Sequence, residues 1–128
     1  MPVDCVKLAL AFLKDIKPKW VLCGINRGGN VGGDTLYSGT VAAALEGTIA
    51  GLPSMALSAL GPDHKSCRYD TAVELVTNLL KSFSTKENLF SKYCLNLNIP
   101  PCSFKDLKGF KKAKLSRRAS SHSYQKSH

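Results

Sequence analysis

The sequence predicts an α/β fold whose strands run parallel, and two observations carry this prediction. Residues 20–25 form an apolar run that ends in a glycine-rich loop, and an alanine-rich helical segment follows that loop. A second apolar run begins after Pro53. A strand, a helix and another strand in this order form a βαβ unit, in which the two strands are parallel.

Sequence patterns place each element in turn. Residues 2–14 predict a helix with a broad apolar face, and Pro18 ends it. Residues 20–25 predict a strand, residues 24–34 a loop, residues 39–50 a helix that Ser38 caps, and residues 54–60 a second strand. The Thr71 to Glu74 segment resembles a capping box before a helix that reaches Phe83, and alternating leucines predict a third strand over 93–99. Further apolar residues at 107–115 suggest one more short element.

Length and apolar pattern favour a single domain over residues 1–115. No apolar run is long enough to span a bilayer, and residues after Met1 lack the basic-then-apolar order of a secretory signal. We therefore expect a cytoplasmic protein without membrane association.

The five cysteines include no Cys-x-x-Cys pair, so we expect reduced thiols, several of them buried, rather than disulfides or a zinc site.

The net charge of +9 is concentrated near the C-terminus. From Lys105 onward the chain has eight Lys or Arg residues against one Asp, whereas the preceding residues have ten against eight acids. A nucleic-acid-binding domain usually carries its positive charge on a folded face, so we expect no specific nucleic-acid binding. Residues 116–128 form a basic tail, rich in Ser and His, that we expect to be disordered.

The glycine-rich loop lies where α/β proteins bind anions, but it matches no common nucleotide fingerprint. It contains no Gly-x-Gly-x-x-Gly pattern, and Asp34 stands where a P-loop needs lysine. The helix after the loop still offers free N–H groups and the positive end of its dipole, with hydroxyls from Ser38 and Thr40 and close access at Gly39. The alternative is that Ser38 is only a helix cap and Thr40 an ordinary first-turn residue.

Asn26 ends the first predicted strand, where open α/β sheets place their ligands. Its side-chain oxygen suits Mg²⁺ or Mn²⁺, or alternatively the side chain stabilises the loop through an Asx turn. Asn30 has the same two interpretations. Asp34 could ligate a metal or serve only in a turn, and His64 is more typical of an exposed loop residue than of a catalytic one.

Taken together, several segments closely resemble the SurE (survival protein E) family of 5'/3'-nucleotidases. They are residues 2–10 (PVDCVKLAL), 23–30 (CGINRGGN), 37–47 (YSGTVAAALEG), 52–58 (LPSMALS), 95–100 (LNLNIP) and 107–109 (LKG). The resemblance implies a Rossmann-like α/β/α sandwich with a mostly parallel sheet. It also implies a phosphatase that depends on a divalent metal (Mg or Mn) and hydrolyses nucleoside monophosphates to nucleoside and phosphate.

By position, the resemblance makes Asn26 a metal ligand and makes Asn30, Ser38, Gly39 and Thr40 phosphate-binding residues. The family's Asp-Asp-Gly metal motif and its long C-terminal arm, which pairs subunits into a homo-oligomer, have no counterpart in this sequence. The resemblance therefore implies a fragment that is inactive alone. The alternative function is a non-catalytic phosphate- or nucleotide-binding remnant of the family.

Overall fold

Three parallel strands in the order β1–β2–β3 form the central sheet of the computed structural model, which describes residues 1–13, 15–83 and 92–116. The strands are β1 (Val21–Arg27), β2 (Ser54–Ala59) and β3 (Cys94–Ile99). In the register of the sheet, Val21 lies opposite Ser54, and Ser54 lies opposite Cys94. These strands agree with the predicted ones to within one or two residues, and the predicted parallel α/β fold is confirmed.

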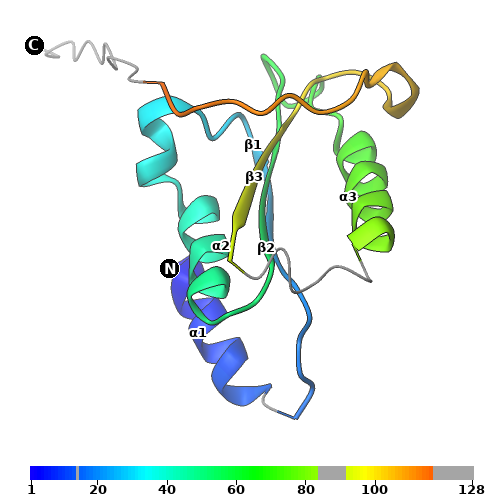
Figure 1. The fold of residues 1–128 in the computed structure, drawn as a ribbon. Helices are drawn as coiled ribbons and strands as arrows, with labels where there is room; N and C mark the ends of the chain where they lie inside the picture. The colour runs from blue at the N-terminus through cyan, green and yellow to red at the C-terminus, as the bar shows by residue number, and fades with distance from the viewer. Residues whose placement is uncertain (14, 84–91, 117–128) are drawn as a thin grey trace, which may run out of the picture.

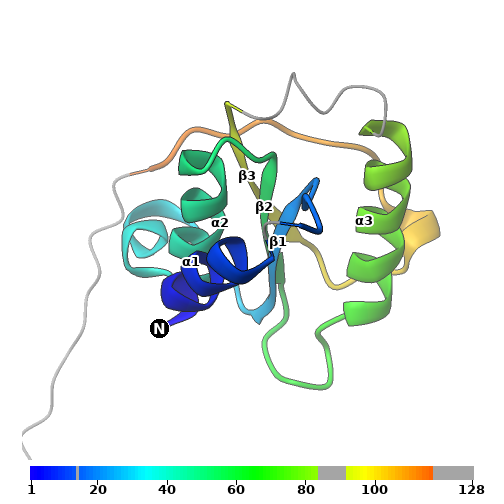
Figure 2. The ribbon, with the colours of Figure 1, turned by 90° about the horizontal axis from the view of Figure 1, so that it is seen from below.

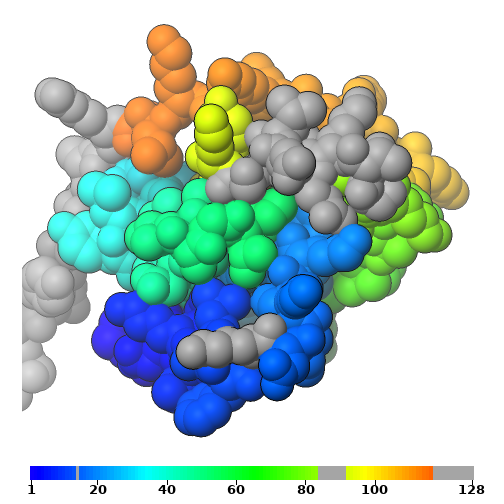
Figure 3. Space-filling view, turned by 60° about the horizontal axis from the view of Figure 1, so that its bottom comes forward, coloured from blue at the N-terminus to red at the C-terminus, as the bar shows by residue number. Residues whose placement is uncertain are grey.

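Helices cover both faces of this sheet. Helix α2 (Gly39–Ile49) packs on one face, and α3 (Tyr69–Phe83) packs on the other (Figures 1 and 2). Helix α1 (Pro2–Phe12) lies against α2 rather than on the sheet, and the space-filling view shows the two side by side (Figure 3). None of the residues of α1 is buried, so its predicted broad apolar face stays largely open to solvent.

The core lies on either side of β2, whose six residues are all buried. Its alternate side chains point to opposite faces, as the pleat of a strand requires. Ala56 packs with Val41 and Ala44 of α2, while Met55 and Leu57 pack with α3. This two-sided burial explains why β2 is apolar or small at every position.

Two short 3-10 helices occur where the sequence predicts loops or an undefined element. The first, η1 (Gly32–Tyr37), occupies the second half of the predicted loop and leads directly into Ser38. The second, η2 (Phe104–Asp106), follows β3. Residues 107–116 contain neither helix nor strand and cross the end of the sheet toward η1 (Figure 1). The apolar residues at 107–115 therefore do not build a further regular element.

The predicted capping box at Thr71 is wrong. Helix α3 begins at Tyr69, so Thr71 already lies inside it, and its hydroxyl donates to the carbonyl of Cys102 at 2.8 Å. The side chain thus ties α3 to the chain after β3 instead of capping the helix.

The expectation of several buried cysteines also needs correction, because Cys67 alone among the five free thiols is buried. The expected disorder of residues 116–128 falls almost entirely outside the described residues.

Candidate phosphate-binding site

The start of α2 is the foundation of the site. Ser38 is the N-cap, and its Oγ accepts the N–H of Val41 at 3.2 Å. The N–H groups of Gly39 and Thr40 precede the first hydrogen bond within the helix, and neither finds another acceptor among the described residues. Two backbone donors and the positive end of the helix dipole therefore face outward together at this point.

The loop after β1 brings Asn26 and Asn30 to the same place. A hollow of about 550 Å³ is lined by these two asparagines and by the residues at the start of α2, namely Pro2, Asp34, Tyr37, Ser38, Gly39 and Thr40. All five residues to which the resemblance gives a metal or phosphate role therefore lie around one hollow. Arg27 and His64 are exposed and do not line it.

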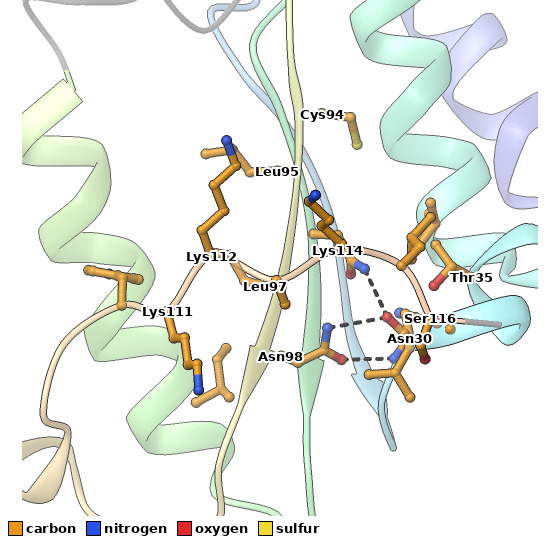
Figure 4. A pocket seen from close by; sticks show the side chains of 18 of the residues that line it. Asn30, Thr35, Cys94, Leu95, Leu97, Asn98, Lys111, Lys112, Lys114 and Ser116 are labelled. Atoms are coloured by element: carbon orange, nitrogen blue, oxygen red, sulfur yellow. Dashed lines mark hydrogen bonds between the residues drawn. The ribbon is translucent and has the colours of Figure 1, made fainter. Parts of the chain in front are cut away.

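Asn30 is held from three sides. The residue is only 5% exposed, and its Nδ2 donates to Ser58 Oγ at 2.6 Å. Its backbone N–H donates to Asn98 Oδ1 at 2.8 Å. Its carbonyl accepts the Nδ2 groups of Asn96 at 2.8 Å and of Asn98 at 3.2 Å. Figure 4 shows Asn30 and Asn98 facing each other across the end of the sheet.

Asn26 partly fits its loop-stabilising interpretation. Its Nδ2 donates to the carbonyl of Gly28 at 3.0 Å, which fixes the turn after β1. The side-chain Oδ1 accepts no hydrogen bond from the described residues and stays available to a ligand. The side chain therefore bonds the loop through its amide nitrogen and not through an Asx turn, in which Oδ1 would accept an N–H, and a ligand role stays open to Oδ1.

The described residues fit one part of a metal site rather than a complete one. Within residues 1–13, 15–83 and 92–116, no three His, Cys, Asp or Glu side chains gather as metal ligands. The hollow receives one carboxylate, from Asp34, and the neutral oxygen of Asn26. A hard dication prefers several oxygen ligands with carboxylates among them, so this set does not hold such an ion by itself.

The half-buried thiols on the α2 side of the sheet have a packing function. Burial raises the pKa of the Cys23 thiol and of the Cys94 thiol, and both pack against the cluster of Val41, Ala44 and Ala56. A raised pKa keeps these sulfurs protonated at neutral pH, so they lack the thiolate character of a nucleophile.

A second, larger cavity of about 1020 Å³ adjoins the site and shares Asn30 with it. It lies between the start of α2, the outer edge of β3 and residues 110–116, and Lys111, Lys112 and Lys114 are among its lining residues (Figure 4). Thr35 Oγ1 and Asn96 Oδ1 are buried there without a hydrogen-bond partner among the described residues. Apart from Asn30, the residues that line this cavity have no ligand-facing role predicted from the sequence.

Sequence reasoning missed the residues that surround Asn30. The sequence predicts no site role for Ser58, Asn96 or Asn98, although residues 95–100 (LNLNIP) are among the segments that carry the resemblance. The signal was the alternation in β3, because two asparagines two residues apart must point to the same face of a strand. Polar side chains on a face that packs against a helix need partners, and here Asn30 is the common one.

Comparison with known proteins identifies the family of the chain. The family model described as "Survival protein SurE" matches residues 1–122. Among curated relatives, a "5'-nucleotidase SurE" from Synechococcus is 42% identical over 98% of this chain and 47% of its own length. One from Fervidobacterium nodosum is 43% identical over 91% of this chain and 45% of its own length.

A solved structure is similar as well. The crystal structure of the SurE protein from Aquifex aeolicus superimposes with a TM-score of 0.81 and 36% sequence identity, over 92% of this chain and 47% of that one. The chain thus spans slightly less than half the length of the relatives that it matches. The family match over nearly all of its residues, together with this shared fold, shows that the chain belongs to the SurE family.

Proposed function

We propose that this chain forms the phosphate-binding part of a SurE-type 5'-nucleotidase, which hydrolyses nucleoside monophosphates to nucleoside and phosphate. The observation that carries the proposal is the hollow at the start of α2. There, Ser38, Gly39 and Thr40 meet Asn30 and Asn26 in a chain of this family. Relatives that are 42% and 43% identical are named as 5'-nucleotidases, which supports the same substrate class for this site.

The chemistry of the hollow suits a phosphoryl group. The free N–H groups of Gly39 and Thr40 donate to phosphoryl oxygens, and the Thr40 hydroxyl adds a donor from a side chain. Fixed donors of this kind stabilise negative charge as it develops in a transition state, because they need no reorganisation during the reaction. A favourable, partly buried helix terminus contributes up to about 2 kcal/mol to holding an anion.

We propose Asn26 Oδ1 as one ligand of a divalent ion, Mg²⁺ or Mn²⁺. Such an ion, when bound, polarises the phosphoryl oxygens and activates a water molecule. Among the described residues, Asp34 adds the one carboxylate that lines the hollow, and no three His, Cys, Asp or Glu side chains gather as ligands. We therefore assign this chain the binding and orientation of phosphate and derive no reaction step through the metal.

Binding without hydrolysis is the second candidate function. The described residues give the hollow several anion donors but a single carboxylate, and this imbalance favours a nucleotide-binding role for the chain by itself. A nucleoside monophosphate is the expected ligand in both cases.

We also propose a cytoplasmic location, homo-oligomeric assembly of the complete nucleotidase and no specific nucleic-acid binding. In the described residues, no helix has the length and apolarity to cross a membrane.

Calorimetry and a phosphate-release assay separate the two functions. We expect the purified chain to bind inorganic phosphate and AMP saturably at one site, and to release negligible phosphate from AMP with Mn²⁺ present. Clear Mn²⁺-dependent turnover that disappears in Asn26→Ala would establish catalysis by this chain and exclude the binding-only function. Absence of saturable binding of either ligand would refute the phosphate site itself.

A further inference from the structure

We propose that Asn98, together with Asn96 and Ser58, positions Asn30 for phosphate before any ligand arrives. This inference rests on the proposed function, because Asn30 is one of the proposed phosphate-binding residues. The three positioning residues come from β2 and β3, lie distant from Asn30 in sequence and reach it through four hydrogen bonds.

The register of the sheet explains why these side chains meet. Asn26 of β1 lies opposite Ser58 of β2, and Ser58 lies opposite Asn98 of β3. Residues opposite one another in neighbouring strands point to the same face, so one polar row crosses the sheet near the carboxyl ends of all three strands. Asn96 stands two residues before Asn98 and shares its face. The loop after β1 passes this row at Asn30.

The hydrogen bonds satisfy both backbone polar groups of Asn30 and leave one hydrogen of its side-chain amide free. The backbone N–H and carbonyl are both satisfied by asparagines of β3, so the loop cannot shift there without breaking these bonds. Ser58 Oγ accepts one of the two Nδ2 hydrogens. The second hydrogen remains for an anion in the hollow, and Asn30 lines that hollow.

Gly29 lets the loop after β1 lie close to Asn98 of β3. A Cβ on Gly29 would lie 3.3 Å from Asn98 Oδ1 and 2.9 Å from the Cδ2 of Leu60. A side chain there would therefore crowd the carbonyl oxygen that accepts the Asn30 N–H. The side chains that hold Asn30, namely those of Ser58, Asn96 and Asn98, are all uncharged. Asn30 is therefore fixed without a carboxylate that would repel phosphate. Ligand affinity gains when ordering of a loop is completed before binding.

The test combines amide hydrogen exchange at Asn30 with phosphate binding, both on the ¹⁵N-labelled chain. In Asn98→Ala, which removes both bonds from Asn98, we expect exchange protection of the Asn30 N–H to fall at least about tenfold and the phosphate Kd to rise about tenfold. Asn98→Asp keeps an oxygen that accepts the Asn30 N–H but loses the Nδ2 that donates to the Asn30 carbonyl, so protection there should fall less than in Asn98→Ala.

Two controls separate positioning from general stability and charge. Val76→Ala weakens the core on the α3 face and should lower the melting temperature without changing the phosphate Kd. Asn78→Asp makes the same substitution at an exposed position of α3 and should leave both readouts unchanged. A purely structural role for Asn98 would make Asn98→Ala behave as Val76→Ala does.

Each outcome decides a separate question. Unchanged exchange at Asn30 in Asn98→Ala overturns the proposal, whatever the phosphate result. Lost protection with an unchanged Kd shows that Asn98 orders the loop without serving the ligand, which also overturns it. If the unmodified chain binds no phosphate, the proposed function fails for this chain, and the positioning of Asn30 is decided by exchange alone.

Discussion

Ser38 has two functions in the proposed site, and two substitutions should separate them. Its Oγ caps α2 by accepting the Val41 N–H at 3.2 Å, and it also lines the hollow beside the free N–H groups of Gly39 and Thr40. Alanine removes the cap, whereas aspartate is as good a cap as serine but adds a negative charge. Ser38→Ala should therefore lower the stability of the chain. Ser38→Asp should keep that stability but weaken anion binding.

The magnitudes follow from the position of the side chain. Ser38→Ala should lower the free energy of unfolding by about 1 kcal/mol, the usual contribution of an N-cap hydroxyl. Ser38→Asp should leave stability unchanged or raise it by about 0.3–1 kcal/mol through the helix dipole. At a separation of about 6 Å and an effective dielectric constant near 20, the new carboxylate repels each unit of phosphate charge by about 3 kcal/mol. That repulsion weakens binding about a hundredfold or more.

Urea unfolding and calorimetric titration with inorganic phosphate measure the two effects. Ser82→Asp is the matched control, because it places the same charge on an exposed position of α3, away from the hollow. It should leave the phosphate Kd unchanged. If Ser38→Asp binds phosphate as well as the unmodified chain does, the anion does not bind at the start of α2 and our interpretation of the hollow is refuted.

Three further predictions concern the scaffold. The Arg68 guanidinium, bonded to Asp70 at 2.6 and 2.9 Å, lowers the pKa of that carboxyl to about 2, so the pair's stabilisation is complete above pH 3.8 and is lost as pH falls through about 2. NMR titration should place the Asp70 midpoint near 2, and Arg68→Ala should move it toward 3.8. Gly24→Ala should destabilise the chain by about 2 kcal/mol or more in urea unfolding, because Gly24 has φ +129° and a Cβ there would lie 2.5 Å from the carbonyl oxygen of Leu57. Met55→Ala should cost about 2–5 kcal/mol by the same method, since Met55 is fully buried in the central strand; a loss below 1 kcal/mol would contradict the two-sided core.

Local sequence patterns predicted the strands and helices because each has a simple physical cause. The apolar runs at β1 and β2 are typical of strands covered on both faces, and the serine before the alanine-rich α2 is typical of a helix cap. The start of α3 was misplaced because Thr71 satisfies its hydroxyl through the distant carbonyl of Cys102. A long-range hydrogen bond of this kind leaves no local sequence signal.

The residues of the candidate site could be predicted from the sequence, but the side chains that hold Asn30 in place could not. The resemblance to a known family identified Asn26, Asn30 and the Ser-Gly-Thr segment, and the structure brings them together around one hollow. The environment of Asn30 depends on which residues of β2 and β3 lie opposite one another. That register comes from packing of the whole sheet, so the contribution of Asn98 emerges only from the assembled fold.

Titration of the ¹⁵N-labelled chain with inorganic phosphate, followed by NMR, tests the central claim most directly. We predict saturable shifts of the Gly39 and Thr40 backbone amides and of the Asn30 side-chain amide, with one common dissociation constant. Shifts confined to the lysine-rich residues 105–114, or no saturable shift at the start of α2, would contradict the phosphate site.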